Sequence, residues 1–362
     1  MRLRVGVVGC GEIAQMSHLR YLDELRELFE IASVCDLSKE LVEKIGARYR
    51  VTSRHHDYRQ LLDEALDAVF VLTREHMPIA LAAIERGLHV FVEKPLAFTV
   101  KQADSIIEAA RRNRVKLMVG YQKRFNPGFE YAQSIFRELE EPKLIRLHSS
   151  VGSPQRMKEQ IYELVRGADL PQEELKEAAL RERKSYIEAI GSDDEGLLIA
   201  YRLLIQLWSH YINLLRGAFG DPQEIVSSIV RELETPTGLP SCQVISVFDY
   251  GNQTSCIWES QAFVANNKWD DELVVFANDR TVRVLFPDPF LKNAPAIVQN
   301  QRSSSNGFVT EITEASYQEA FKRELVHFHT CIVEDKEPLT NGEDARADLE
   351  LMTKMVLSAK AL

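Results

Sequence analysis

Short, nearly continuous hydrophobic runs alternate with amphipathic stretches over the first 120 residues. The runs are rich in β-branched residues, as is typical of strands buried on both faces. They are Leu3–Val8, Ile31–Cys35, Ala68–Leu72, His89–Val92 and Lys116–Val119. The segments between them with helical spacing are Lys39–Tyr49, Pro78–Arg86 and Val100–Asn113. This alternation predicts βαβ units, and therefore an α/β domain with a parallel sheet.

The pattern changes after Phe125-Asn126-Pro127-Gly128. A helix over Gly128–Leu139 and a strand over Leu144–Val151 precede a polar, helix-rich stretch from about Pro154 to Gly191. Alternating runs joined by short turns then predict an antiparallel sheet. These runs are Val244–Tyr250, Ser255–Phe263, Glu272–Ala277 and Thr281–Phe286, and two amphipathic helices follow at Gln318–Glu334 and Glu343–Ala361.

A chain of 362 residues is too long for one ordinary core, so two domains are expected. We place them at 1–124 and 125–362, with the last helix able to pack back on the first domain. The net charge of -10 disfavours nucleic acid and anionic membranes as partners. The five cysteines form no C-x-x-C pair, and no signal peptide or membrane span is visible, so we expect a cytoplasmic protein.

A glycine-rich turn follows the first predicted strand. Residues Gly9-Cys10-Gly11-Glu12-Ile13-Ala14 read G-x-G-x-x-A between a strand and a helix, the context that a dinucleotide-binding turn requires. Gly9 allows the tight turn, and Gly11 lets the backbone approach a diphosphate at the helix N-terminus. With Glu12 and Ile13, these residues are the predicted diphosphate site, and an ordinary strand–helix turn is the alternative.

Asp36 follows the second predicted strand and is the expected partner of the adenosine ribose hydroxyls. Its carboxylate would repel a 2′-phosphate, so NAD is favoured over NADP. Lys39 and Arg48 lie nearby in sequence and moderate that preference.

At Glu93-Lys94-Pro95, after the fifth strand, the chain resembles the Gfo/Idh/MocA oxidoreductases, whose hallmark is this E-K-P. The segment Val119–Pro127 is similar to the family's sixth-strand region, and Glu324–Phe328 with Leu339–Glu343 resembles its C-terminal region. The likeness is strong over 1–127 and 318–362 and weak between them.

The resemblance implies a Rossmann domain followed by a substrate-binding and oligomerisation domain with a large, open, mostly antiparallel sheet. It implies hydride transfer between a nicotinamide and an alcohol or carbonyl of a sugar, cyclitol or similar polyol. Lys94 would be the acid/base, since neutral lysine accepts a hydroxyl proton and burial would bring its pKa toward neutrality. Glu93, Thr73, Glu75 and Gln122 are then further candidates for cofactor binding.

Two departures from the family pattern bear on function. The family's D-x-x-x-H and its later Asp correspond to Gln206, His210 and Asn213, so both carboxylates are replaced by amides. Helical spacing puts these three on one face, where they could bind substrate with Arg124, and His210 could share proton transfer with Lys94. The family's T-P-N-x-x-H becomes Thr73–Pro78 and keeps only the Thr.

Three functions remain open from the sequence. The leading one is an NAD(P)-dependent dehydrogenase or reductase acting on CH–OH groups. The others are an NAD-dependent glycoside hydrolase and a non-catalytic NAD-binding sensor or scaffold. An open sheet with one exposed apolar face would aggregate unless covered, so a homodimer or homotetramer through that sheet is expected. No metal site is expected, because His55-His56 and His327/His329 lack further ligands at helical spacing.

Overall fold

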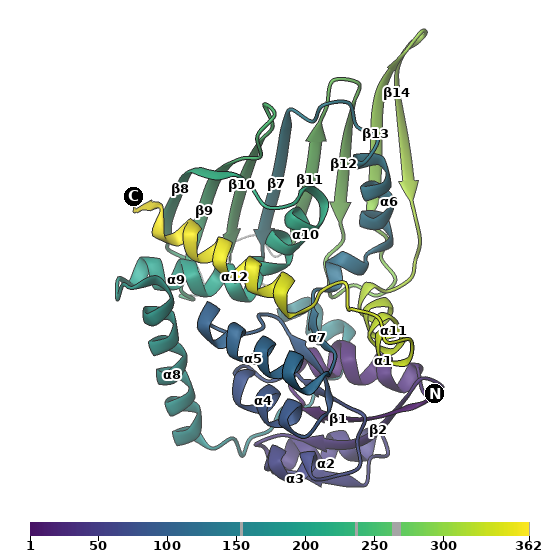
Figure 1. Ribbon diagram of the computed structural model, residues 1–362, viewed down its shortest axis with the longest axis vertical. Coiled ribbons are helices and arrows are strands. Elements are labelled where there is room, and N and C mark those ends of the chain that lie inside the picture. Colours follow the sequence, from purple (N-terminus) through teal and green to yellow (C-terminus); the bar gives the residue numbers. More distant parts are fainter. Residues whose placement is uncertain (153–154, 236–237, 263–268, 362) are drawn as a thin grey trace. The chain divides into compact units, whose positions relative to one another are not determined.

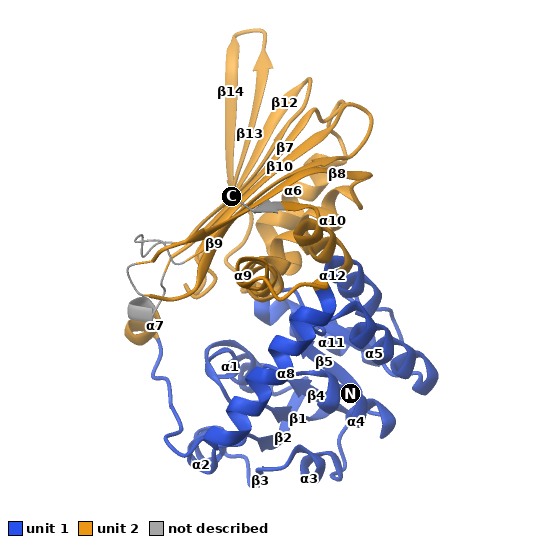
Figure 2. Ribbon diagram, turned by 90° about the vertical axis from the view of Figure 1, so that its left-hand side faces the viewer, with its two compact units in different colours: residues 1–121, 162–189, 321–349 blue, residues 122–161, 190–320, 350–362 orange. Residues whose placement is uncertain are grey.

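The computed structural model describes residues 1–152, 155–235, 238–262 and 269–361, which form two compact units (Figure 2). Unit 1 contains residues 1–121, 162–189 and 321–349, and unit 2 contains residues 122–161, 190–320 and 350–362. The first division, after Tyr121, lies close to the proposed boundary at residue 124. Residues 162–189 and 321–349, which the two-part division had placed in the second domain, belong to unit 1.

Unit 1 is built on a six-stranded parallel sheet with the order β3-β2-β1-β4-β5-β6. The strands are β1 (Leu3–Val8), β2 (Phe29–Cys35), β3 (Ser53–His55), β4 (Ala68–Val71), β5 (His89–Glu93) and β6 (Leu117–Gly120). The predicted alternation is confirmed: β1 and β4 are buried at nearly every position because helices pack on both faces. Successive strands are added on one side of β1 up to β3 and on its other side from β4 onward, and Rossmann folds bind their ligands at this switch between β1 and β4.

The helices of unit 1 have clear local causes. Ser38 caps α2 (Lys39–Arg48) by accepting from Leu41 N, and Thr99 caps α5 (Val100–Asn113) by accepting from Gln102 N. The remaining helices are η1 (Ala14–His18, a π-helix), α1 (Leu19–Glu24), α3 (Tyr58–Leu62), α4 (Met77–Glu85), α8 (Gln172–Ile190) and α11 (Ala320–Val333). The last helix, α12 (Gly342–Leu357), begins in unit 1 and ends in unit 2.

Unit 2 contains a nine-stranded sheet with the order β14-β13-β12-β11-β7-β10-β9-β8-β15 (Figure 1). Neighbouring strands are antiparallel except for the pairs β7/β10 and β8/β15. The strands are β7 (Leu144–Val151), β8 (Glu224–Leu233), β9 (Ser241–Asp249), β10 (Ser255–Ala262), β11 (Asp270–Phe276), β12 (Arg280–Phe286), β13 (Ile297–Ser304), β14 (Gly307–Glu314) and β15 (Ala359–Ala361). The large, mostly antiparallel sheet is therefore confirmed.

Helices cover one face of this sheet (Figure 2). They include α6 (Pro127–Phe136), α9 (Glu195–Leu203) and α10 (Ser209–Phe219), and the side chains beneath them, such as Leu147 and Trp258, are fully buried. The other face is less apolar than expected: Arg146 and Glu259 form an ion pair there, and Arg283 pairs with Glu272. Ile257 on the same face is 37% exposed.

The fold differs from the sequence expectations at the final helix and in three strands of the sheet. The final helix ends at Leu357 rather than Ala361, and Ala359–Ala361 instead add the edge strand β15. Strands β8, β13 and β14 were not predicted. In β14 nearly every position is exposed, so the strand lacks hydrophobic alternation. The expected strand Ser255–Phe263 is confirmed over Ser255–Ala262, and Phe263 lies outside the described residues. Within the described ranges, no helix has the length and hydropathy to cross a membrane.

Candidate functional site

The carboxyl ends of four adjacent parallel strands bring most of the predicted cofactor residues to one edge of unit 1. Gly9 follows β1, Asp36 follows β2, Thr73 follows β4, and Lys94 follows β5. A Cβ on Gly9 would lie 2.8 Å from the carbonyl carbon of Leu72, so the turn after β1 touches the chain after β4. The strand order therefore gathers residues that are up to 85 positions apart, counted from Gly9 to Lys94.

The two glycines of the turn serve different needs. Gly9 has φ +99°, a conformation that side chains disfavour, and its neighbours leave no room for a Cβ. Gly11 has neither constraint: it is exposed, and a Cβ there would meet nothing within 4 Å. The folded chain itself gives no steric reason for glycine at position 11. A bound diphosphate supplies one, because its oxygens approach the backbone of such turns closely.

Asp36 is held rigidly at the start of the segment that leads into α2. Its Oδ2 accepts from Cys10 N at 2.8 Å, and its Oδ1 accepts from Ser38 N at 3.0 Å. The carboxylate thus links the glycine-rich turn to α2. It retains lone pairs for further hydroxyl donors, because a carboxylate offers about four acceptor sites.

The segment after β4 is joined to the E-K-P segment by a histidine that the sequence analysis did not single out. The two ring nitrogens of His76 lie 2.6 Å from Thr73 O and 2.7 Å from Pro95 O. Burial lowers the pKa of His76, although both carbonyl contacts oppose this, and a neutral ring can donate to only one of them. Thr73 Oγ1 donates to Glu75 O, and the Glu75 carboxylate pairs with Arg181 of α8 at 3.1 Å.

Glu93 supports Lys94 from within the protein interior. One oxygen of Glu93 accepts from Lys94 N at 3.0 Å, and the other lies 2.6 Å from Nε2 of His18, which is fully buried. Burial acts to raise the pKa of Glu93, but the hydrogen bond and charge of His18 and the charge of Lys94 leave it below the ordinary value. The Lys94–Pro95 peptide is cis.

Lys94 combines partial burial with a nearby carboxylate. Burial lowers the pKa of its ammonium group, and the negative charge of Glu93 opposes that shift in part. A lysine with a lowered pKa is neutral in a larger fraction of molecules near neutral pH. It can therefore accept a proton, and its ammonium form can return one.

A second carboxyl group lies close to Glu93. Glu324 of α11 is completely buried, and neither of its oxygens has a hydrogen-bond partner among the described residues. Burial, reinforced by the charge of Glu93, raises the pKa of Glu324 well above its ordinary value. These surroundings therefore favour the protonated form of Glu324 and the ionised form of Glu93.

The other predicted site residues belong to unit 2. Gln122 and Arg124 lie on η2 (Gln122–Phe125), which packs against α10. The guanidinium of Arg124 donates to Asn213 Oδ1 at 3.1 Å and to Asn213 O at 3.2 Å. Both residues are buried, and the absence of a side chain at Gly217 makes room for the Arg124 guanidinium. This arrangement fixes η2 on α10.

The predicted alignment of Gln206, His210 and Asn213 assumed regular α-helical spacing. A π-helix, η3 (Leu204–Trp208), instead precedes α10, so Gln206 and His210 lie on segments of different helical pitch. Gln206 and His210 are half-buried, whereas Asn213 is fully buried. The three therefore differ in their access to a ligand.

A buried ion pair next to η2 was also missed by the sequence analysis. Lys123 Nζ lies 3.0 Å from Asp271 Oδ2 and 4.7 Å from the ring centre of Tyr211, which also hydrogen-bonds to Asp271. The hydroxyl of Ser149 donates a hydrogen bond to the other carboxylate oxygen, Asp271 Oδ1, at 2.9 Å. Because the Asp271 carboxylate is bonded to Lys123, Tyr211 and Ser149, we assign this cluster to holding η2 on the sheet.

Nowhere in the described ranges do three or more His, Cys, Asp or Glu side chains gather to hold a metal ion.

The strand order of unit 1 and the turn after β1 are those of a Rossmann fold. Residues 3–121 match the profile of the GFO_IDH_MocA family, described as an oxidoreductase family with an NAD-binding Rossmann fold. Residues 3–121 are therefore similar to the NAD-binding Rossmann domain of this family.

Curated relatives match less than half of the chain, whereas solved structures match nearly all of it. An inositol 2-dehydrogenase/D-chiro-inositol 3-dehydrogenase from Shouchella clausii (strain KSM-K16) is 34% identical over 161 residues, covering 42% of this chain and 46% of the relative. The chain thus spans about half the length of the curated relatives it matches.

Two solved structures cover almost the whole chain. A 3-ketoreductase from Actinomadura kijaniata in complex with NADP has a TM-score of 0.75 at 16% identity, over 100% of this chain and 99% of that one. A UDP-N-acetylglucosamine 3-dehydrogenase from Acidithiobacillus ferrooxidans has a TM-score of 0.71 at 19% identity, over 99% and 98%. At these identities the likeness shows a shared fold.

Proposed function

We propose that this protein is an NAD-dependent oxidoreductase that transfers a hydride between the nicotinamide and a CH–OH or carbonyl carbon of a sugar, cyclitol or similar polyol. The observation that carries the proposal is Lys94, a lysine with a lowered pKa at the same sheet edge as the glycine-rich turn. The family of residues 3–121 and the names of the inositol and sugar dehydrogenases above support the substrate class.

When bound, the nicotinamide supplies the hydride acceptor or donor. Lys94 takes the hydroxyl proton in oxidation, and its ammonium form returns the proton to the carbonyl oxygen in reduction. The Glu93 carboxylate accepts a hydrogen bond from the backbone N–H of Lys94. His18 contacts the other oxygen of this carboxylate and so helps to fix the position of its negative charge near Lys94. Burial lowers the pKa of Lys94 and the charge of Glu93 opposes that shift in part, so a larger fraction of Lys94 is neutral than of an exposed lysine.

For cofactor binding, we propose that Gly9, Gly11, Glu12 and Ile13 hold the diphosphate and that Asp36 holds the adenosine ribose. NAD is the preferred cofactor, because Asp36 would repel a 2′-phosphate. We propose half-buried Gln206 and His210 as substrate-binding residues, with His210 assisting proton transfer. Arg124 and Asn213 are assigned to positioning η2, since both are buried and bonded to each other.

The test is a substrate panel of inositols, sugars and nucleotide sugars with NAD⁺ and NADP⁺, followed by the near-ultraviolet absorbance of the reduced nicotinamide. We expect at least one polyol to reduce NAD⁺ and the corresponding ketone to oxidise NADH. Cleavage of a glycoside without net reduction would instead establish the hydrolase. Cofactor binding without turnover over the whole panel would favour the sensor.

We also propose that the protein forms a homodimer or homotetramer through the sheet of unit 2. The sheet face opposite α6, α9 and α10 carries Ile257, which is 37% exposed. Light scattering coupled to size exclusion is expected to give at least about twice the chain mass of 41.3 kDa. Ile257→Glu should shift the protein toward monomer, whereas Val326→Glu, on α11 and equally exposed at 37%, should not. A monomeric wild-type protein at about micromolar concentration would contradict the proposal.

A further inference from the structure

Residues 163–169, which we call the strap, run between α7 (Gln155–Ile161) and α8 and contact both sides of the predicted cofactor site. At one end, Gln15 clamps the strap to the helix that follows the glycine-rich turn. Its side chain accepts from Val165 N at 2.8 Å and donates to Val165 O at 2.9 Å. The same amide group donates to Cys10 O at 2.9 Å. The strap is thus joined directly to the turn that carries Gly9 and Gly11.

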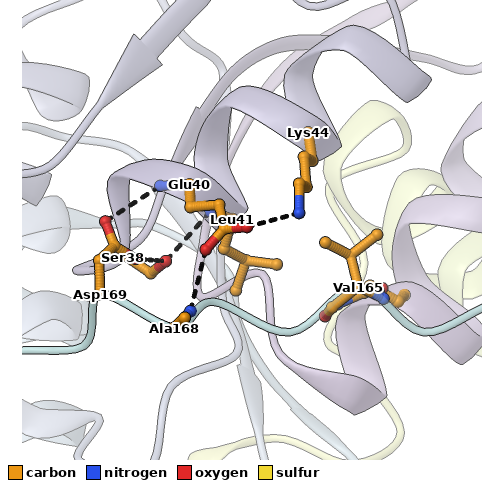
Figure 3. Close-up of polar contacts among 8 residues, drawn as sticks. Ser38, Glu40, Leu41, Lys44, Val165, Ala168 and Asp169 are labelled. Atoms are coloured by element: carbon orange, nitrogen blue, oxygen red, sulfur yellow. Dashed lines mark hydrogen bonds and ion pairs between the residues drawn. The ribbon is translucent and has the colours of Figure 1, made fainter.

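At its other end, the strap is bonded to the first turn of α2 (Figure 3). One carboxylate oxygen of Asp169 accepts from Glu40 N at 3.1 Å, and the other accepts from the hydroxyl of Ser38. Ala168 N donates to the Glu40 side chain at 3.0 Å. The Asp169 carboxylate thereby occupies donors at the N-terminus of a ten-residue helix, a position that favours anions.

The strap sequence fits this close approach. A Cβ on Gly167 would lie 2.0 Å from Ser38 Oγ, so only glycine allows the strap to pass so near α2. The hydrogen bond from Ser38 lowers the pKa of Asp169 despite some desolvation, so Asp169 is ionised at neutral pH.

Two cations of α2, Lys44 and Arg48, are also engaged. Lys44 pairs with Glu40 at 2.5 Å, and the Arg48 guanidinium donates to the backbone carbonyl of Glu163 in the strap at 3.1 Å. Ser38 is bonded from two sides, because its N–H donates to Asp36 and its hydroxyl donates to Asp169. Two carboxylates therefore flank the residue that starts α2.

In a Rossmann domain the carboxylate after the second strand meets the ribose 2′-hydroxyl, so a phosphate on that hydroxyl would extend toward the first turn of the next helix. We propose that Asp169 is a specificity-determining residue that excludes the 2′-phosphate of NADP. The Asp169 carboxylate accepts the hydrogen bonds of Ser38 Oγ and Glu40 N, which such a phosphate would need, and it places a negative charge beside the phosphate position. This inference rests on the proposed function, because it assumes that unit 1 binds a nicotinamide dinucleotide.

Calorimetric titration of NADH and NADPH into the full chain tests the inference, using wild type, Asp169→Ala, Asp169→Asn and the exposed control Asp193→Ala. In wild type we expect tighter binding of NADH. Asp169→Ala should tighten NADPH binding about tenfold, as expected for removing one charge several ångströms from a phosphate, and change NADH binding less than about threefold. Asp169→Asn keeps the shape and removes the charge, so it should give a smaller gain in the same direction.

The outcomes separate the two claims. If wild type binds neither cofactor, the proposed function fails. If wild type binds NADH but the ratio of the two affinities is the same in Asp169→Ala and Asp193→Ala, the specificity role of Asp169 is overturned. An equal loss of both affinities in the Asp169 variants would also overturn it, because the strap would then hold either cofactor without discrimination. Circular dichroism of each variant confirms that α2 and its domain remain folded.

Discussion

Replacing Lys94 with alanine is expected to lower turnover of the panel-identified substrate about a thousandfold, within the range that loss of a positioned acid/base produces. Lys94 is the lysine at the carboxyl edge whose pKa burial lowers, and alanine can neither accept nor return a proton. NADH binding should persist, because the glycine-rich turn and Asp36 remain in place. The measurement is kcat with saturating cofactor and substrate, beside a calorimetric Kd for NADH.

Two variants sharpen this result. Lys101→Ala removes a lysine whose side chain is 86% exposed on α5, and it should leave kcat unchanged. Lys94→Arg keeps the positive charge but does not release a proton near neutral pH, so oxidation should remain slow. If Lys94→Ala retained a third or more of wild-type kcat, the role of Lys94 as acid/base would be wrong.

Replacing Glu324 with glutamine is expected to remove a pH dependence from folding stability. The pKa of Glu324 lies well above its ordinary value of 4.5 in the folded chain. Above about pH 5 the unfolded chain releases this proton while the folded chain keeps it, so wild-type stability falls as pH rises toward the folded pKa. For one proton the slope is about 1.4 kcal/mol per pH unit. Glutamine resembles the neutral acid but has no proton to lose.

The stability of Glu324→Gln relative to wild type should therefore rise as the pH increases from about 5 toward the folded pKa of Glu324. Urea unfolding followed by circular dichroism measures this difference. Tryptophan fluorescence is less suitable, because Trp208, Trp258 and Trp269 all lie in unit 2. Glu108→Gln, at an exposed position on α5, is the matched control and should show no pH-dependent difference. A constant difference between Glu324→Gln and wild type would mean that Glu324 is ionised in the folded chain.

Hydrophobic periodicity was sufficient for most of the fold. Val100–Asn113 was predicted with its observed limits, because a capping Thr99 and regular spacing act locally. Strand β14 was not predicted, since nearly all of its residues are exposed and it is ordered by pairing with β13. Strand β15 was not predicted either, because residues 359–361 continue a helical sequence pattern and form a strand only by pairing with β8.

Local motifs pointed to the candidate site residues that a turn or strand end presents, such as Gly9, Asp36 and Lys94. They did not identify His18, whose partner Glu93 lies 75 residues away, or His76, whose contact with Pro95 spans 19 residues. They also did not identify Glu324, whose burial depends on tertiary packing. The signal available in the sequence for Glu324 was a charged residue among the apolar positions of the amphipathic helix predicted over Gln318–Glu334. The sequence also showed no sign of the contact between Asp169 and α2, since the hydrogen bond from Ser38 to Asp169 spans 131 residues.

The central claim is that the glycine-rich turn of unit 1 binds a nicotinamide dinucleotide, and NADH titration into wild type and Gly11→Ala tests it most directly. A Cβ at position 11 meets nothing within 4 Å, so this variant should match the unfolding free energy of wild type within about 0.5 kcal/mol. We predict saturable NADH binding to wild type and at least about tenfold weaker binding to Gly11→Ala. Absence of NADH and NADPH binding to wild type, or equal affinity in the two proteins, would contradict the account.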